Sequence, residues 1–380
     1  MEPTKAAFGI WSGGQFMHFG TKIEDARMEA LIQQSFDQGV RTFMTSDVYG
    51  QGEADRRLGQ GIAGMPRDEI CVTGMIGHDF YQGEREGSKG FPRFTNPELR
   101  GAKDYRDYLF SAAEKSAERC QIDSFDLLLL HNPDSVGYSS DAVWSAMSEL
   151  KSQGLAKKVG VAPGPANGFT LDMLLCFERF QEVVDWAMII LNPMEPWPGR
   201  MALPGSERFG VDLIARVVDY GGIFHDDVKP GHEFGPSDHR TYRPAGWVEA
   251  GNQKLERMRP YAEKYGATPL QLSCLWNLAF PSVQSVVPTL IQELGDEAKP
   301  IEAKLEELAS LPDVDISVED RDAIESIGDN ANCMALKGGN PEYDGAPVAD
   351  RWKLNADLAA IAEKWGIDPE ADLAHAHATA

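Results

Sequence analysis

The sequence of 380 residues is poor in cysteine and contains no closely spaced cysteine pair. Its five cysteines are Cys71, Cys120, Cys176, Cys274 and Cys333. A disulfide framework or a structural zinc site needs cysteines at short, recurring spacings, so both are disfavoured. The scattered thiols favour a reduced interior and therefore a cytoplasmic protein.

Basic residues are also scarce. The chain has 36 Lys and Arg against 59 Asp and Glu, a net charge of −23. Nucleic acids and anionic membranes attract basic surfaces, so we expect neither as a partner, and expect a small-molecule substrate instead. No run approaches the ~18 apolar residues of a membrane span, and the first residues lack the pattern of a signal peptide. The sequence carries no signal for an oligomeric state.

Short apolar runs alternate with amphipathic segments through most of the chain, and 42% of the residues are hydrophobic. The apolar runs predict strands, and the amphipathic segments predict helices. The helix expected before the seventh strand covers residues 211–221. The expected strands are residues 8–11, 40–44, 69–75, 125–131, 156–162, 185–191, 222–225 and 283–288.

This repeated strand-then-helix order predicts parallel strands and, at this length, a closed (β/α)8 TIM barrel with long strand-end loops. An open doubly wound sheet is the alternative, but the stretch WSGGQFMHFG lacks the Gly-x-Gly-x-x-Gly fingerprint that such a sheet would carry. We expect the barrel to occupy residues 1–330. Residues 331–380 are expected to form a helical extension that packs on or beside it.

Three stretches at expected strand ends carry polar residues: TSDVYGQGEADRRLGQGI, FDLLLLHNPD and LKSQGLAKKVGVA. Together with YAEKYGATPLQLSCLWNLAFPSVQSVVP, they make the chain similar to the aldo-keto reductase family from about Phe8 to Ile327. The resemblance implies hydride transfer between NADPH and a carbonyl compound. It also implies that the chemistry takes place at the C-terminal ends of the barrel strands.

Four side chains carry the reaction in that family, and two of them differ in this chain. A Tyr donates the proton, a Lys lowers its pKa, an Asp pairs with the Lys, and a His polarises the carbonyl. By resemblance, Tyr49 and His131 take the Tyr and His places, whereas Met44 and Met75 stand at the Asp and Lys places. Because either charge alone would be an unpaired buried ion, their joint loss is a matched replacement. We expect Tyr49 to remain a neutral phenol.

The family's cofactor-binding positions differ as well. Ala162 and Pro163 replace a Ser-Asn pair after the fifth strand. The run VVPTLIQELGDEAKP brings acids where the family binds the 2′-phosphate of NADP, and FHDDVKPG replaces a ring-stacking aromatic. We expect NADP or NAD as the cofactor. The candidate cofactor-binding residues are Asn192, Thr289 and Asn167.

Other polar and aromatic residues also fall at predicted strand ends. His131, His225 and Asp226 could bind Zn, Mn or Fe, but no His-x-His or His-Glu-x-x-His spacing supports a metal, and we predict none. They could equally hydrogen-bond among themselves at a polar barrel mouth. The catalytic candidates are Tyr49, His131, His78 and Asp47. The candidate pocket residues are Trp11, Met44, Met75, Asn132, Trp197, His225, Asp226 and Lys229.

Three functional hypotheses follow. The first is a divergent aldo-keto reductase that uses NAD(P)H on a carbonyl or sugar-type substrate, with Tyr49 as acid and His131 as polariser. The second is a lyase or isomerase on the same barrel that uses Tyr49 with His131 or His78 for proton chemistry, with or without a metal. The third is a regulatory or scaffold subunit without catalysis. In the first hypothesis, Lys229 is a candidate to replace the lost Lys.

Overall fold

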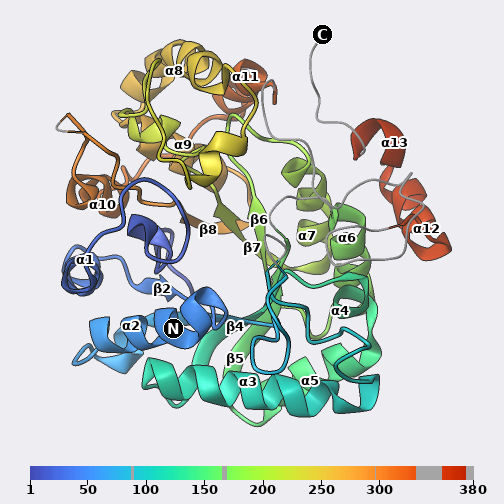
Figure 1. Ribbon diagram of the computed structural model, residues 1–380. Coiled ribbons are helices and arrows are strands. Elements are labelled where there is room, and N and C mark those ends of the chain that lie inside the picture. Colours follow the sequence, from blue (N-terminus) through green and yellow to red (C-terminus); the bar gives the residue numbers. More distant parts are fainter. Residues whose placement is uncertain (87–89, 165–168, 296, 331–352, 374–380) are drawn as a thin grey trace.

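The computed structural model describes residues 1–86, 90–164, 169–295, 297–330 and 353–373 (Figure 1). Eight parallel strands follow one another around a single sheet in the order β1 to β8. A parallel bridge between Ala6 and Val286 brings the last strand back to the first, and the Val286 N–H donates to the Lys5 carbonyl at 2.9 Å. The predicted (β/α)8 barrel is confirmed.

The strands are short and end at one face of the barrel. Their bounds are β1 (Ala7–Gly9), β2 (Thr42–Met44), β3 (Cys71–Ile76), β4 (Phe125–His131), β5 (Ala156–Ala162), β6 (Trp186–Ile190), β7 (Asp212–Arg216) and β8 (Val283–Val287).

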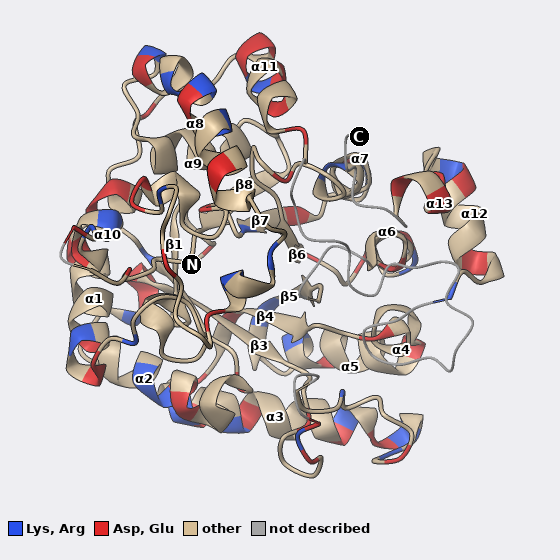
Figure 2. Cartoon of the chain, turned by 45° about the horizontal axis from the view of Figure 1, so that its top comes forward, with Lys and Arg blue, Asp and Glu red and all other residues tan. Residues whose placement is uncertain are grey.

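Helices surround the strands on the outside. Those before β8 are α1 (Asp25–Asp37), α2 (Glu53–Gly61), α3 (Tyr105–Cys120), α4 (Ser135–Ser139), α5 (Asp141–Ser152), α6 (Thr170–Arg179), α7 (Leu203–Phe209), α8 (Trp247–Lys264) and α9 (Pro269–Leu278). Those after β8 are α10 (Ile301–Ala309), α11 (Val318–Gly328), α12 (Ala356–Trp365) and α13 (Pro369–Asp372). Figure 2 shows charged residues of both signs on the outer helices α1, α2 and α3. In the described ranges, none of the helices has the length and hydropathy of a membrane span.

Alternation along the strands divides the core into an interior and an outer layer. In β4, Leu127 and Leu129 belong to the interior cluster, whereas Leu128 and Leu130 pack against the helices. Successive side chains of a strand point to opposite faces, so this pattern identifies the inward residues of every strand. The other interior strand residues are Ala7, Met44, Met75, Ala162, Trp186, Met188, Ile214 and Val287.

The seventh unit differs from the prediction. The sequence predicts a helix over residues 211–221 and a strand over residues 222–225, and both assignments are wrong. The strand is β7, paired with β6 and β8, and residues 223–225 form one 3-10 turn. A short apolar run fits either structure by periodicity alone, and here pairing with two neighbouring strands decides it. As a result, Arg216 is the last residue of β7.

The C-terminal helices lie on the outside of the barrel. In Figure 1, α12 and α13 lie beside α6 and α7. The Trp365 ring meets the Phe209 ring edge-on at 6.2 Å, and Lys364 Nζ donates to Glu178 Oε1 at 2.7 Å. The predicted boundary between residues 330 and 331 adjoins residues outside the described part, so the division of the chain stays a prediction.

Candidate active site

The inward-facing residues at the C-terminal ends of the strands define the mouth of the barrel. Met44 and Met75 belong to the interior cluster. His131 is two residues beyond Leu129, and Arg216 is two beyond Ile214, so strand alternation directs both side chains inward. The sequence predicts the first three of these residues at the mouth. It misses Arg216 because the seventh strand was misassigned.

Tyr49 and His131 lie side by side at this mouth. Tyr49 begins a 3-10 turn just after β2, and its ring meets the His131 ring edge-on at 5.5 Å between centroids. The Trp11 ring lies on another side of Tyr49, 6.2 Å away. The two side chains that the resemblance singles out are therefore adjacent in space, with an aromatic wall beside them. Their catalytic roles remain predictions.

The surroundings of Tyr49 keep its hydroxyl protonated. Burial raises the pKa of Tyr49 to about 12, and the positive charge of Arg216 opposes this shift. Tyr49 packs against the interior cluster that contains Met44 and Met75, which carry no charge. The phenol is therefore neutral at ordinary pH, as the loss of the Lys predicts.

His131 is held as a neutral imidazole. Its Nδ1 lies 2.7 Å from the Ser46 hydroxyl, which also lies within 3.2 Å of the Met75 carbonyl oxygen. Burial, reinforced by the charges of Arg93 and Arg216, lowers the pKa of His131 to about 3. The sequence does not indicate the contact between Ser46 and His131, because the two residues lie 85 positions apart.

The imidazole of His78 lies next to that of His131. The His78 ring centroid is 5.0 Å from that of His131. His78 Nδ1 is 3.1 Å from Arg93 Nη1, and His78 Nε2 is 3.2 Å from Asn132 Nδ2. Arg93 also donates from Nε to the Asn132 carbonyl. Burial and then the charge of Arg93 hold the pKa of His78 well below its ordinary value. The predicted residues His78 and Asn132 thus meet at the mouth. Arg93, which was not among the residues predicted from the sequence, holds them there.

Arg216 brings a guanidinium into the mouth. It lies between Ile190 and Val287 in the strand register, and its side chain is only partly buried. Its Nη2 donates to the carbonyls of Pro163 and Gly164, at 3.2 and 2.5 Å. These bonds tie the end of β7 to the loop after β5. Within the described residues, Nε and Nη1 donate no hydrogen bond.

Asp47 is buried just after β2 but does not replace the lost ion pair. Its backbone N–H donates to the Met75 carbonyl at 3.1 Å. In the part of the chain that the structure describes, neither carboxyl oxygen accepts a well-aligned hydrogen bond. Burial and then the nearby charge of Asp55 raise the pKa of Asp47 well above its ordinary value. The catalytic role of Asp47 stays a prediction.

The three candidate cofactor residues have different surroundings. Asn192 is fully buried, its Oδ1 accepts from the backbone N–H groups of Met194 and Glu195, and its Nδ2 donates to Val217 O and Glu195 Oε2. Its hydrogen-bonding capacity is used in joining the ends of β6 and β7, which leaves little for a ligand. Thr289 donates from its backbone to Asp219. Asn167 lies outside the described residues.

Four candidate pocket residues make contacts of their own. His225 is buried, with Nε2 2.8 Å from the Thr289 carbonyl oxygen. Asp226 pairs with Arg259 of α8 and with Lys229, whose side chain is 48% exposed. Trp197 exchanges backbone hydrogen bonds with the Asn330 amide. The wrong strand assignment grouped His225, Asp226 and Lys229 at the mouth. His225 ends the turn beyond β7, and Asp226 and Lys229 follow that turn.

Metal ligation finds no support in the same region. Among the residues with described positions, no group of three or more His, Cys, Asp or Glu side chains has the arrangement of a metal site.

The loops after β7 and β8 hold buried ion pairs. Arg240 bonds to Asp238 at 2.8 Å and to Glu293 at 2.5 Å, and all three side chains are almost fully buried. Asp238 also accepts from the Gly20 N–H at 2.8 Å, which ties in the loop after β1. Lys304 pairs with Asp227 at 2.6 Å. These loops therefore carry their cations already paired with carboxylates.

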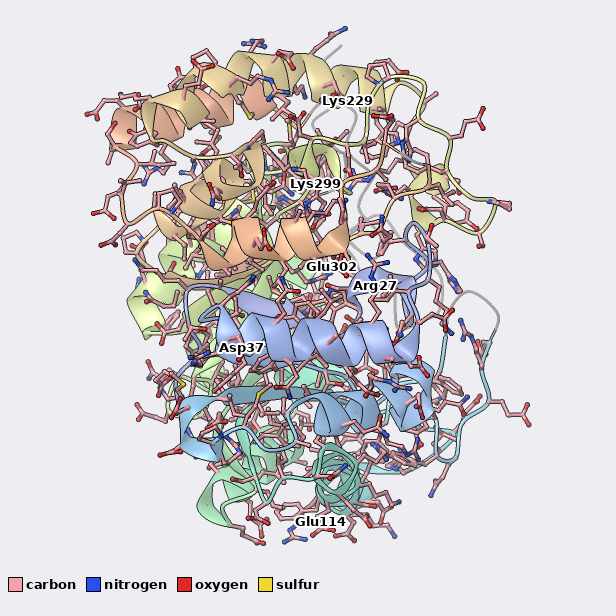
Figure 3. The ribbon with its side chains drawn as sticks, turned by 90° about the vertical axis from the view of Figure 1, so that its left-hand side faces the viewer. Arg27, Asp37, Glu114, Lys229, Lys299 and Glu302 are labelled. Atoms are coloured by element: carbon pink, nitrogen blue, oxygen red, sulfur yellow. The ribbon has the colours of Figure 1, made fainter. Side chains whose placement is uncertain are left out.

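The same pairing continues toward α10. Figure 3 shows Lys299 and Glu302 near the start of this helix, with Arg27 of α1 close to Glu302. Arg27 Nε donates to Glu302 at 2.7 Å, and Lys299 pairs with Glu307 at 2.6 Å.

Comparison with known proteins identifies relatives of this barrel. A probable voltage-gated potassium channel subunit beta from Arabidopsis thaliana is 23% identical over 299 residues, 76% of this chain and 83% of that protein. A D-threo-aldose 1-dehydrogenase from Pseudomonas sp is 24% identical over 199 residues, 47% of this chain and 60% of that protein.

Solved structures show the same fold. A glycerol dehydrogenase from Gluconobacter oxydans has a TM-score of 0.68 at 18% identity, covering 92% of this chain and 96% of that one. An aldo-keto reductase from Klebsiella pneumoniae in complex with NADPH has a TM-score of 0.56 at 16% identity, covering 86% and 91%.

The family assignment rests on the length of the match. Residues 7–306 match the model of the aldo/keto reductase family, a span from β1 into α10. The glycerol dehydrogenase shares this fold, and the aldose dehydrogenase matches part of the sequence. The chain therefore belongs to the aldo/keto reductase family.

Proposed function

We propose that this protein is an oxidoreductase that interconverts a carbonyl or sugar-type substrate and its alcohol with a nicotinamide dinucleotide. The observation that carries the proposal is the pair formed by Tyr49 and His131, whose rings lie 5.5 Å apart at the mouth of the barrel. Both are neutral at ordinary pH, so both suit hydrogen-bonding to a carbonyl oxygen. The family relation supports an oxidoreductase.

Tyr49 is the proton donor in the direction of reduction. Its hydroxyl proton passes to the substrate oxygen as the carbonyl carbon gains a hydride, and the tyrosinate then regains a proton from solvent. The nicotinamide, when bound, supplies this hydride or accepts one in the reverse direction. The charge of Arg216 stabilises the tyrosinate, a task that an ammonium performs in the family pattern.

His131 orients the carbonyl. The Ser46 hydroxyl is closer to His131 Nδ1, at 2.7 Å, than to the Met75 carbonyl, at 3.2 Å. When the Ser46 hydroxyl hydrogen points to His131 Nδ1 instead of the Met75 carbonyl, the ring proton lies on Nε2 and bonds the substrate oxygen, and this tautomer is part of the proposal.

The cofactor positions fit a nicotinamide dinucleotide in part. Arg216 stands at the strand-seven end, where the resemblance places a ring-stacking aromatic, so that aromatic is missing here. By the same resemblance, the 2′-phosphate of NADP lies after strand eight. In the described part of that region, Arg240, Lys299 and Lys304 already pair with carboxylates. A phosphate there would face Glu293 without a free cation. We therefore propose NAD(H) over NADP(H).

The lyase or isomerase alternative gains no support from the site. It needs His131 or His78 as a general base, and an efficient base has a pKa near the working pH. The pKa of His131 is lowered to about 3, and that of His78 also falls well below its ordinary value.

Transfer of deuterium tests the proposal. NADH deuterated at C4 is incubated with the protein and a panel of aldoses and short aldehydes, and the product is examined by mass spectrometry. We expect the label on the former carbonyl carbon, and a rate about 100-fold lower in Tyr49→Phe. Tyr242, whose side chain is 76% exposed, provides the matched control Tyr242→Phe. An unlabelled product, or an undiminished rate in Tyr49→Phe, would contradict the proposal.

A further inference from the structure

We infer that the mouth of this barrel selects carbonyl substrates that carry a carboxylate, and that Arg216 binds this carboxylate. The inference rests on the proposed function, and it adds the substrate class. It is carried by the guanidinium at the end of β7 and by the charges around it.

The position of Arg216 directs its charge toward the reacting groups. Strand alternation directs its side chain into the mouth, as it does for His131. The Pro163 and Gly164 carbonyls hold Nη2, which fixes the plane of the guanidinium. Nε and Nη1 have no acceptor among the described residues, so three N–H donors remain available beside the Tyr49 and His131 pair.

The charged groups around Tyr49 and His131 favour an anionic ligand at the mouth of the barrel. The charge of Arg93 also acts on His131, and its guanidinium bonds His78 and the Asn132 carbonyl. The carboxyl group closest in sequence to Tyr49 is that of Asp47, and burial raises its pKa well above the ordinary value. Asp79 is bonded to Arg100. The Arg216 guanidinium therefore places a positive charge beside Tyr49 and His131 in a protein whose net charge is −23, and such a local field favours an anionic ligand.

The chemistry of the donors points to a carboxylate. Guanidinium N–H groups form short, charge-assisted bonds to carboxylate oxygens. With the carbonyl oxygen on Tyr49 and His131, the carboxylate of the same small molecule binds Arg216. Oxo acids and sugar acids with an open aldehyde form combine both groups.

Matched substrate pairs test the inference. The pairs are D-glucuronate with D-glucose, and pyruvate with pyruvamide, each measured as kcat/KM with saturating NADH. The members of each pair differ in the carboxylate. A charge-assisted hydrogen bond predicts a preference of about 10- to 100-fold for the acid. Equal kcat/KM within both pairs would overturn the inference and leave the proposed function intact.

Variants assign the preference to one residue. Arg216→Gln should abolish it, and Arg216→Lys should retain part of it. Arg106→Gln is the control, because Arg106 is an exposed arginine paired with Glu149 of α5. If Arg216→Gln instead weakens NADH binding and leaves the preference for the acid unchanged, Arg216 belongs to the cofactor site and the inference fails.

Binding of oxamate, which cannot be reduced here, separates the inference from the proposed function. Calorimetric titration should show that wild-type protein and Arg106→Gln bind oxamate, and that Arg216→Gln binds it at least tenfold more weakly. Arg216-dependent oxamate binding without turnover of any pair would remove the proposed function and support the carboxylate site. An absence of oxamate binding in wild-type protein would overturn the inference.

Discussion

Restoring the missing ion pair is the perturbation that bears most directly on the chemistry of Tyr49. The double variant Met44→Asp with Met75→Lys places a carboxylate and an ammonium where the family pattern has them. Both methionines are interior residues of adjacent strands, and both belong to the cluster against which Tyr49 packs. The ammonium should therefore stabilise the tyrosinate.

The size of the effect follows from the surroundings of Tyr49. Its pKa is about 12 because the phenol is buried. An opposite charge within ~4–6 Å lowers a pKa by roughly 1–3 units, which predicts a value of about 9–11 in the double variant. The ionised fraction at pH 8 would rise from about 1 in 10,000 to between about 1 in 1,000 and 1 in 10.

The single variants provide the internal comparison. Met75→Lys or Met44→Asp alone leaves an unpaired charge in the apolar interior, which should destabilise the fold by about 3–5 kcal/mol. The loss in the free energy of unfolding of the double variant should be smaller than the sum of the losses of the two single variants, by roughly 1–3 kcal/mol. Urea unfolding midpoints measure these differences.

Ultraviolet absorbance of the tyrosinate measures the pKa of Tyr49. Because the chain has 10 tyrosines, each titration is repeated with Tyr49→Phe, and the difference isolates the single residue. A folded double variant in which Tyr49 titrates at the wild-type value would refute the reasoning. It would mean that Met44 and Met75 do not occupy the positions of the lost pair.

Three further predictions concern other groups. The pKa of Tyr49 is about 12 and that of His131 is about 3, so neither group titrates between about pH 5 and 9. The rate of carbonyl reduction should therefore not change with pH in this range. The rate of alcohol oxidation, which needs the tyrosinate, should rise about tenfold per pH unit. A bell-shaped reduction profile centred near neutral pH would contradict this. Ser46→Ala should lower kcat/KM for reduction about three- to tenfold and change the His131 tautomer seen by nitrogen NMR; an unchanged tautomer would exclude the proposed hydrogen bond. Arg240→Met should destabilise the protein by about 3–5 kcal/mol, because it leaves the buried Glu293 carboxylate without its arginine partner. Adding Glu293→Gln should recover part of this loss of stability, measured by urea unfolding. Equal midpoints for wild type and Arg240→Met would show that this ion pair contributes nothing.

The barrel could be predicted because its signal is local. Each apolar run and each amphipathic segment reflects burial within a few residues, and eight repeats outweigh one wrong assignment. The error at β7 shows the limit of this signal. Its apolar residues fit a strand or a helix equally well, and partners in β6 and β8, far away in the sequence, decide between them.

The candidate site could be predicted only where a motif marks it. Tyr49 and His131 come from stretches that resemble the family, and the structure brings them together. Ser46, Arg93 and Arg216 were missed because their importance depends on contacts across the barrel. Arg93 lies in a long loop after β3, and no local pattern shows that it reaches His78 and Asn132. Register and loop conformation, which the sequence does not state, create those contacts.

Side-chain pairing explains why other candidates do not meet at the mouth. Asp226 and Lys229 are polar residues near a glycine-rich turn, which is a reasonable signal for a site. In the structure they pair with each other, and Asp226 also pairs with Arg259 of α8. An acidic or basic residue in a loop finds a partner wherever the fold brings one, and the sequence alone does not identify that partner.

Equilibrium titration of the purified protein with NADH and then NADPH, followed by nucleotide fluorescence, shows whether this barrel binds a nicotinamide dinucleotide and which one it prefers. We expect micromolar binding of NADH and weaker binding of NADPH, because Arg240, Lys299 and Lys304 in the described part of the region after β8 already pair with carboxylates. Tighter binding of NADPH would contradict that explanation of cofactor choice. Failure to bind either nucleotide up to millimolar concentration would contradict the claim that this barrel carries out hydride transfer.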